Sequence, residues 1–369
     1  MKQKEKTKVL VAMSGGVDSS VAALLMKEKG YDVIGGFMKN WSMTRQGIGK
    51  CWKDEIIPAI KVAAMLEIPL LTFNFEEEYY RDVVEEMYKS YKKGITPNPD
   101  IDCNQKLKFP LFWKEAQKMG LDYIVTGHHA RIKKTRKGFE LLRGKDEKKD
   151  QSYFLYRLTQ DDLKHSLFPI GNYTKKQVRE IARKAGFGNY NRKSTVGLCF
   201  IGKVNMKEFL QKKIKPKQGK ILDPEGKVIG QHDGIYYYTI GHRIGPRYGI
   251  DILKDAGEEK SMKKWYVAKK IPKSNTIIAA PENHPLNFRK EITINQPHWI
   301  NEKPSENKNY PVKSRIRQVG ELLPSKLSYN KTAKKYSVTL SKPITGVSEG
   351  QAIVLYQKTT VLGGGAISF

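Results

Sequence analysis

The chain has 369 residues, more than one domain usually contains, so we expect two or three domains with ample core. Lysine and arginine number 67 against 38 acidic residues, and the net charge of +29 favours a polyanionic partner such as RNA, DNA or an anionic membrane. A run of about 18 or more apolar residues and a signal-peptide apolar region are both missing, which argues against membrane insertion and secretion. We therefore expect a cytoplasmic enzyme.

The first motif along the chain is Ser14 to Ser20, SGGVDSS. Val9 to Ala12, before it, is an apolar run typical of a buried parallel strand, and Val17 to Leu25 carries apolar residues at helical spacing. Gly15 and Gly16 allow the backbone to approach a ligand, while the N-terminus of the helix directs N–H groups at it. An anion site is therefore predicted. The motif has neither the lysine of a Walker A loop nor the G-x-G-x-x-G spacing of a dinucleotide fold.

This loop resembles the pyrophosphate loop of the ATP pyrophosphatases. The resemblance implies that ATP is cleaved between its α and β phosphates to leave an adenylated substrate, with Mg²⁺ near Asp18. It places the nucleotide contacts at Ala12, Met13, Ser14, Gly15, Gly16, Val17, Asp18 and Ser19. The alternative is a Ser/Gly-rich turn without a ligand.

Strand and helix patterns alternate through the rest of the first half. We predict strands at Tyr31–Met38, Leu70–Phe75 and Tyr123–Thr126, and helices at Ile57–Leu66, Glu77–Tyr91 and Phe109–Met119. This alternation predicts an α/β domain with a doubly wound parallel sheet and ligands at the carboxyl ends of its strands. The lysine-rich run from Arg143 to Asp150 is interpreted as a solvated loop.

From about residue 214 the pattern changes to short strand candidates separated by Gly- and Pro-containing turns. The candidates are Tyr236–Ile240, Trp265–Ala268, Val312–Ile316, Tyr336–Leu340 and Ala352–Tyr356, with Gly363–Gly365 as a late turn. Short strands without helices must close or stack to protect their edges. We predict a catalytic domain over 1–213, a β-rich central domain over 214–284 and a C-terminal β-barrel, or a sandwich, over 285–369.

Several further motifs, in this order along the chain, identify a family. They are TPNPDIDCN (96–104), GHHAR (127–131), KDQSYFLY (149–156), LFPIG (167–171), GLCFIG (197–202), GQHDGIYYYTIG (230–241), GQAIVLY (350–356) and VLGGGAI (361–367). Together they resemble the bacterial tRNA-specific 2-thiouridylase family, MnmA. Members activate the wobble uridine of certain tRNAs with ATP and replace its C2 oxygen with sulfur.

The resemblance assigns the sulfur chemistry to two cysteines. Cys199 would carry a persulfide, and Cys103 would release the sulfur by forming a disulfide with it. Cys51, Cys103 and Cys199 form no C-x-x-C pair, so the fold must assemble any cysteine chemistry. An inert buried thiol is the alternative for each. A second possibility within the family is that Asp100, Cys103 and Cys199 ligate an iron–sulfur cluster.

The same resemblance supplies single contacts. Asp100 is a candidate acid or base, or a contact to the target base together with Asn98 and Pro99, and the alternative is a Pro-Asn-Pro-Asp turn. Met38 and Gly127 match nucleotide contacts, although Met38 could simply be a core residue. The matching tRNA contacts are His128, Lys149, Asp150, Gln151, Arg315, Ile316 and Gln351. The implied partners are tRNAs for Lys, Glu and Gln, and a cysteine desulfurase or sulfur-relay protein.

Four positions depart from the family pattern. Ser194 replaces a carboxylate, and Asp102 stands where an apolar residue is usual, beside Cys103. A carboxylate there raises the pKa of the neighbouring thiol unless Lys106 or a helix N-terminus offsets it. His242 and Ile244 change the usual YTIGQRKG motif, with the loss of a lysine at Ile244.

Two other classes of function remain open. One is a different adenylating enzyme with the same loop, of the lysidine, 4-thiouridine or amide-forming synthetase type, which would not need both cysteine motifs. The other is a non-catalytic RNA-binding or sulfur-carrier protein, which the net charge alone supports. Its RNA affinity would not depend on ATP.

Overall fold

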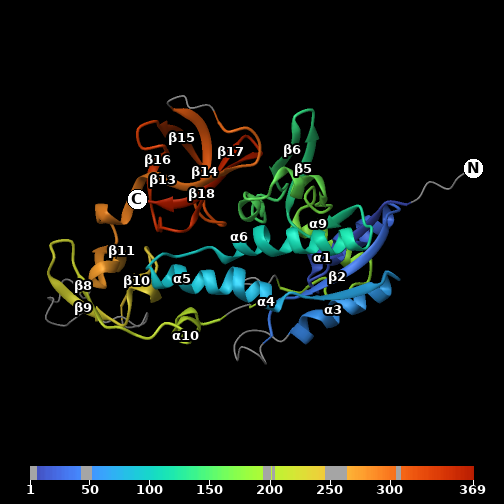
Figure 1. Ribbon diagram of the computed structural model, residues 1–369, viewed down its shortest axis with the longest axis horizontal. Coiled ribbons are helices and arrows are strands. Elements are labelled where there is room, and N and C mark those ends of the chain that lie inside the picture. Colours follow the sequence, from blue (N-terminus) through green and yellow to red (C-terminus); the bar gives the residue numbers. More distant parts are fainter. Residues whose placement is uncertain (1–5, 43–51, 194–200, 202–203, 246–263, 305–308) are drawn as a thin grey trace, which may run out of the picture.

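The structure is a computed structural model that describes residues 6–42, 52–193, 201, 204–245, 264–304 and 309–369. Within these residues the strands form three sheets (Figure 1). No helix in the described ranges has the length and apolar character needed to cross a membrane.

The first sheet is parallel and has the order β3-β2-β1-β4-β7. Its strands are β1 (Lys8–Ala12), β2 (Asp32–Lys39), β3 (Leu70–Asn74), β4 (Tyr123–Val125) and β7 (Ser166–Leu167). Val9, Leu10 and Val11 of the central strand are completely buried, because helices cover both faces of a sheet of this kind. The predicted doubly wound sheet is confirmed.

Helices surround this sheet and extend beyond it. They are α1 (Val17–Glu28), α3 (Trp52–Met65), α4 (Glu76–Tyr79), α5 (Glu86–Lys92), α6 (Pro99–Cys103), α7 (Pro110–Lys118), α8 (Gln160–Lys164), α9 (Lys175–Lys184) and α10 (Met206–Gln211). A π-helical segment, Tyr80–Glu85, joins α4 to α5, so the predicted helix over 77–91 is one continuous helical path. Short 3-10 and π segments lie at Ser152–Leu155, Pro272–Ser274, Pro285–Asn287 and Asn104–Lys108.

The central sheet has the order β10-β11-β12-β8-β9. Its strands are β8 (Gly219–Leu222), β9 (Val228–His232), β10 (Arg243–Ile244), β11 (Trp265–Ile271) and β12 (Thr276–Pro281). The predicted strand over Tyr236–Ile240 is wrong, because Ile235–Tyr237 forms a 3-10 turn. The tyrosines there direct their hydroxyls at local partners instead, with Tyr237 donating to the Ile214 carbonyl and Tyr238 to Asp233.

The last sheet closes into a six-stranded barrel through the additional pairing of β13 with β18. Its strands are β13 (Phe288–Trp299), β14 (Tyr310–Arg315), β15 (Leu323–Asn330), β16 (Lys335–Thr345), β17 (Ala352–Gln357) and β18 (Thr360–Ser368). The hairpin β5 (Ala130–Thr135) and β6 (Gly138–Arg143), from the first half of the chain, adds to the barrel beside β18.

The turn predicted at Gly363–Gly365 is wrong, because these glycines lie inside β18. A Cβ on Gly364 would lie 2.1 Å from the Ile353 carbonyl oxygen, and one on Gly363 would lie 2.0 Å from that of His298. The glycines therefore allow β18 to pack closely between β17 and β13.

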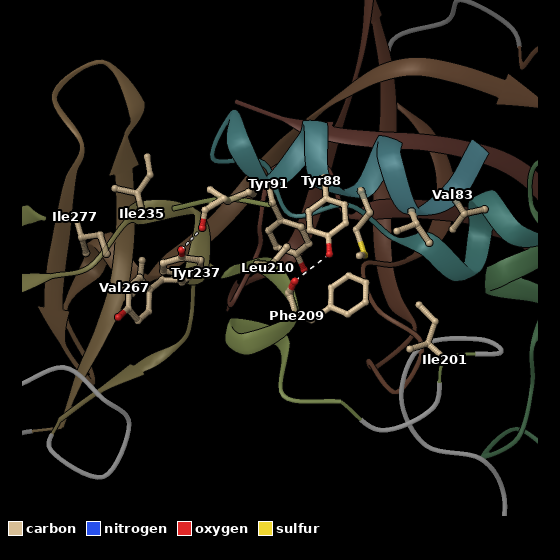
Figure 2. Packing of buried hydrophobic residues seen from close by; sticks show 14 of the residues in the cluster. Val83, Tyr88, Tyr91, Ile201, Phe209, Leu210, Ile235, Tyr237, Val267 and Ile277 are labelled. Atoms are coloured by element: carbon tan, nitrogen blue, oxygen red, sulfur yellow. Dashed lines mark hydrogen bonds between the residues drawn. The ribbon is translucent and has the colours of Figure 1, made fainter. Parts of the chain in front are cut away.

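Hydrophobic clusters cross the sheet boundaries. Figure 2 shows α5 packing Tyr88 and Tyr91 against Phe209 of α10, near Ile235 and Val267 of the central region. The Tyr88 hydroxyl donates to the Phe209 carbonyl at 2.9 Å, and the two rings stack. The central sheet is thereby attached to the helices of the first domain.

Candidate functional site

The glycine loop follows β1 and leads into α1, as the sequence predicts. Gly15 has φ +72, and a Cβ at this position would lie 2.1 Å from the Glu55 carbonyl oxygen. No other residue fits without displacing α3. The Ser14 backbone N–H donates to the Ser19 hydroxyl at 3.1 Å, so the loop is closed by its own side chains.

A cavity of about 540 Å³ opens at the carboxyl ends of β1, β2 and β4. Of the predicted nucleotide contacts, all but Gly15 line it: Ala12, Met13, Ser14, Gly16, Val17, Asp18, Ser19, Met38 and Gly127. Among the predicted catalytic and tRNA contacts, Asp100, His128, Lys149 and Gln151 line it. Gln318 and Val319, from the barrel, complete the wall. One cavity therefore joins the loop to α6 and to the barrel.

Asp18 is held by two basic residues from distant parts of the chain. The Lys175 ammonium donates to both carboxylate oxygens of Asp18, at 2.7 and 2.6 Å, and His129 Nε2 lies 3.3 Å from one of them. Burial alone would raise the pKa of Asp18, but the His129 hydrogen bond and the Lys175 charge outweigh it, and the pKa is lowered. Asp18 is therefore an anion with a built-in counter-ion.

A second group clamps the loop from outside. Arg192 donates to the Gly15 carbonyl at 3.0 Å and to Glu55 at 3.1 Å, and Asn189 donates to the same carbonyl at 3.1 Å. Asn189 also reaches the Ser20 hydroxyl at 2.9 Å. These contacts fix the shape of the loop.

His128 lies at the end of β4, where its ring stacks on Phe109 and meets Phe168 edge-on. Its Nδ1 is 2.7 Å from the Thr126 hydroxyl. Burial holds the pKa of His128 well below its ordinary value. The ring is therefore neutral at physiological pH and faces the cavity as a hydrogen-bonding group without charge.

Asp100 and Cys103 lie on α6, a short helix where the sequence also allowed a turn. Asp100 lines the cavity, whereas Cys103 is completely buried beside Trp41 and Leu107. Asp102 lies 3.7 Å from Lys106, and burial raises the pKa of Asp102. Cys199 and Ser194 lie outside the described residues.

Asp150 is completely buried, so the prediction of a solvated loop fails at both ends of the 143–150 run. Its carboxylate accepts from Arg315 at 3.0 Å, from Arg143 at 3.4 Å and from the Gly144 and Ser152 backbone N–H groups. Gln318 donates to its carbonyl. Asp150 and Arg315, both predicted to contact tRNA, here join the first domain to the barrel. Between Arg143 and Asp150, the two buried ends of the run, Lys145, Lys148 and Lys149 are exposed.

The start of α6 is tied to the barrel in the same way. Gln351 donates to the carbonyls of Thr96 and Pro97 and accepts from Asn98 at 3.4 Å. Ile316 is buried, and its carbonyl accepts from the Tyr153 hydroxyl at 3.3 Å. Asn98, Pro99, Ile316 and Gln351 therefore lie behind the cavity wall.

The two described departures in the central domain behave differently. Ile244 is buried in the cluster that joins this domain to α5, so an apolar residue suits the position. His242 has its pKa lowered by burial. Neither residue lines the cavity.

The sequence analysis missed several residues that line the cavity. They are Asn40, Asn104, His129, Lys175 and Arg192. A signal existed for Lys175, because Thr174 and Gln177 form a capping box that starts α9 and makes Lys175 its first residue. Lys175 and Arg192, together with four further lysines, give the cavity a basic rim. The four lysines are Lys108, Lys148, Lys149 and Lys193.

Three family models cover the chain in succession. A model described as tRNA methyl transferase HUP domain matches residues 7–203, one described as tRNA methyl transferase PRC-barrel domain matches 207–281, and one described as Aminomethyltransferase beta-barrel domain matches 289–367. The parallel sheet, the glycine loop and these matches define a HUP-domain protein with two appended β domains.

Full-length relatives narrow the class. The chain is 41% identical to the tRNA-specific 2-thiouridylase MnmA of Colwellia psychrerythraea, over 99% of this chain and 97% of that protein. It is 40% identical to the tRNA-specific 2-thiouridylase MnmA of Enterococcus faecalis, over 100% of this chain and 96% of that one. The chain belongs to the MnmA family of tRNA-specific 2-thiouridylases.

Proposed function

We propose that this protein is an ATP-dependent tRNA 2-thiouridylase, a sulfurtransferase that converts the wobble uridine of tRNA to 2-thiouridine. One observation carries the proposal: a single cavity brings the pyrophosphate-type loop, Asp100 of the cysteine-bearing helix and a basic rim together. Sequence identity of 41% and 40% to MnmA proteins, over 99% and 100% of this chain, supports tRNA as the substrate. A cytoplasmic location follows from that substrate.

The first step is activation of the uridine. The C2 oxygen attacks the α phosphate of ATP, the bond between the α and β phosphates breaks, and pyrophosphate leaves. The loop N–H groups and the N-terminus of α1 bind the pyrophosphate. Lys175 is placed to neutralise the charge that develops on it, because its ammonium already lies in the cavity beside the loop.

Asp18 fits the requirement for Mg²⁺, which commonly takes one or two carboxylates together with substrate phosphates. It would hold the ion next to the β and γ phosphates, where the ion supplies charge neutralisation. Lys175 would then transfer its hydrogen bonds from Asp18 to a phosphate.

The second step is sulfur transfer. The terminal sulfur of a persulfide on Cys199 attacks C2, and the C–O bond breaks to release AMP. The Cys103 thiolate then attacks the Cys199 sulfur, so 2-thiouridine leaves with the sulfur and a Cys103–Cys199 disulfide forms. A thiol reductant regenerates the pair, and a cysteine desulfurase or sulfur-relay protein reloads it. Asp100 is the candidate acid or base for proton movement at the uracil.

The iron–sulfur alternative uses Asp100, Cys103 and Cys199 as ligands. Among the described residues no group of three His, Cys, Asp or Glu side chains could hold a metal, and Cys199 lies outside them. The disulfide route accounts for both cysteines without a metal, so it is the one proposed.

The RNA contacts of the proposal divide into two sets. Lys149, Gln151 and His128 face the cavity and would touch the anticodon loop. The second set would affect RNA binding indirectly, by holding the barrel and α6 in position. It consists of Asn98, Pro99, Asp150, Arg315, Ile316 and Gln351. Unpaired anticodon-loop bases suit such a site, because their edges are accessible to side chains. tRNAs for Lys, Glu and Gln are the proposed substrates.

The test is mass spectrometry of nucleosides from these tRNAs after incubation with protein, Mg-ATP and a persulfide source. We expect ATP-dependent 2-thiouridine that disappears in Cys103→Ala and Cys199→Ala. A different uridine or cytidine adduct would instead indicate another adenylating enzyme. Sulfide incorporation only by iron-loaded protein would favour the cluster. RNA binding without ATP consumption would leave a non-catalytic RNA-binding protein.

A further inference from the structure

Asn40 is a buried polar residue without a described partner. It directly follows β2, is 2% exposed and lines the cavity. Neither its amide nitrogen nor its amide oxygen has a hydrogen-bond partner among the described residues. Met38 and Trp41, close to Asn40 in sequence, are buried apolar residues.

Asn104 presents a second such group in the same cavity. It is 4% exposed and immediately follows Cys103. Its amide nitrogen donates to the Phe154 carbonyl at 3.3 Å, which fixes the orientation of the side chain. The amide oxygen is buried and has no partner in the described part of the chain.

Buried amide groups are nearly always hydrogen-bonded, because an unpaired buried amide loses its hydrogen bonds to water and gains none in the protein. A leucine has almost the shape of an asparagine and would avoid this penalty at residue 40. Two such exceptions lining one ligand-sized cavity point to a ligand that supplies the missing partners.

We propose that Asn40 and Asn104 form a nucleobase-recognition site in which their amides hydrogen-bond the edge of a base that enters the cavity. An asparagine offers a donor beside an acceptor, which matches both the N3–H and O4 of uracil and the amino group and ring nitrogen of adenine. The inference rests on the proposed function, in which tRNA supplies a uracil and ATP supplies an adenine. Uracil is favoured, because Asn104 adjoins Cys103, and contacts at N3 and O4 leave the C2 oxygen to react.

The experiment measures binding without turnover, with Asn40→Leu and Asn104→Leu. The RNA arm compares an anticodon stem-loop carrying the wobble uridine with the same loop made abasic there. The nucleotide arm compares ATP with ribose 5-triphosphate. Wild type should prefer the base-containing ligand in at least one arm, and each variant should reduce that preference roughly ten-fold. A loss confined to the RNA arm identifies uracil, and one confined to the ATP arm identifies adenine.

A stability measurement separates recognition from structural support. Ligand-free Asn40→Leu should melt at the same temperature as wild type or higher, because it removes an unpaired buried amide. The matched control is Asn287→Leu, since the buried amide nitrogen of Asn287 donates to the Pro281 carbonyl at 2.6 Å and Asn287 does not line the cavity. It should lower the melting temperature and leave base preference intact.

The proposal is overturned if neither variant changes base preference, if wild type shows none, or if both lose affinity equally for ligands with and without a base. A clear drop in the melting temperature of Asn40→Leu also overturns it. Because these readouts need no sulfur transfer, an absence of thiolation by wild type would count against the proposed function alone.

Discussion

Lys175 and Asp18 are separated by 157 residues, yet the ammonium of one donates to both carboxylate oxygens of the other. The pair lies beside the glycine loop, at the N-termini of α9 and α1. It places a cationic hydrogen-bond donor and a candidate Mg²⁺ ligand next to the expected path of the leaving pyrophosphate.

Replacing Lys175 with methionine should therefore impair activation of the uridine. We expect Lys175→Met to slow tRNA-dependent AMP formation by about 10²- to 10³-fold, the usual effect of removing one preorganised charge or donor. Lys176→Met is the matched control, because Lys176 is the next residue and is exposed. Quenched-flow measurement of AMP checks the result. An equal effect of the two substitutions would remove the assigned role.

The lowered pKa of Asp18 predicts a pH dependence of stability. Because the folded-state pKa of Asp18 lies below the ordinary value of an aspartate in the unfolded chain, the carboxylate stabilises the fold above that ordinary pKa, and the contribution disappears as pH falls through the folded-state pKa. The difference in melting temperature between wild type and Asp18→Asn should thus shrink from pH 6 towards pH 3. Thermal melts at constant ionic strength measure it. A difference that grows on acidification would contradict the assignment.

The buried Asp150 cluster should be important for stability. Asp150→Asn leaves Arg143 and Arg315 without their shared carboxylate, so we expect a loss of about 3–5 kcal/mol in the free energy of unfolding. The exposed pair of Lys342 and Glu321 provides the comparison, and Glu321→Gln should change the value by about 1 kcal/mol or less. Urea denaturation reports both. Similar small effects would show that the cluster is dispensable.

Gly364 should tolerate no side chain. In Gly364→Ala the new Cβ would meet the Ile353 carbonyl oxygen at 2.1 Å, and relief requires separation of β17 from β18. We expect a loss of about 3 kcal/mol or more in stability. Gly188→Ala is the control, because a Cβ there meets nothing within 4 Å. A wild-type melting temperature in Gly364→Ala would refute this reason for the glycine.

The sequence predicted the features that depend on local pattern. Apolar runs such as Val9 to Ala12 predicted buried strands, and the SGGVDSS motif predicted the glycine loop. The Lys175–Asp18 pair could not be predicted, because nothing near either residue specifies a partner 157 positions away. The prediction of a solvated loop failed at Asp150 for a related reason. A charged run alone indicates a solvated segment, and the ion-pair partner of Asp150 in the barrel, Arg315, is 165 residues away in sequence. Gly363–Gly365 was misread because glycine marks turns and close strand packing alike.

The shared hydrophobic clusters have a consequence for how the chain unfolds. Leu10, Phe112 and Tyr153 of the first domain pack in one cluster with Val354 and Tyr356 of the barrel, while Tyr88 and Phe209 pack in another with Trp265 and Ile277 of the central sheet. Each β domain therefore shares a hydrophobic cluster with the first domain, and the barrel also has a cluster of its own that includes Val338 and Leu355. The chain is tripartite by sequence family but should melt in a single cooperative transition, and a truncated catalytic domain would expose two apolar faces to water.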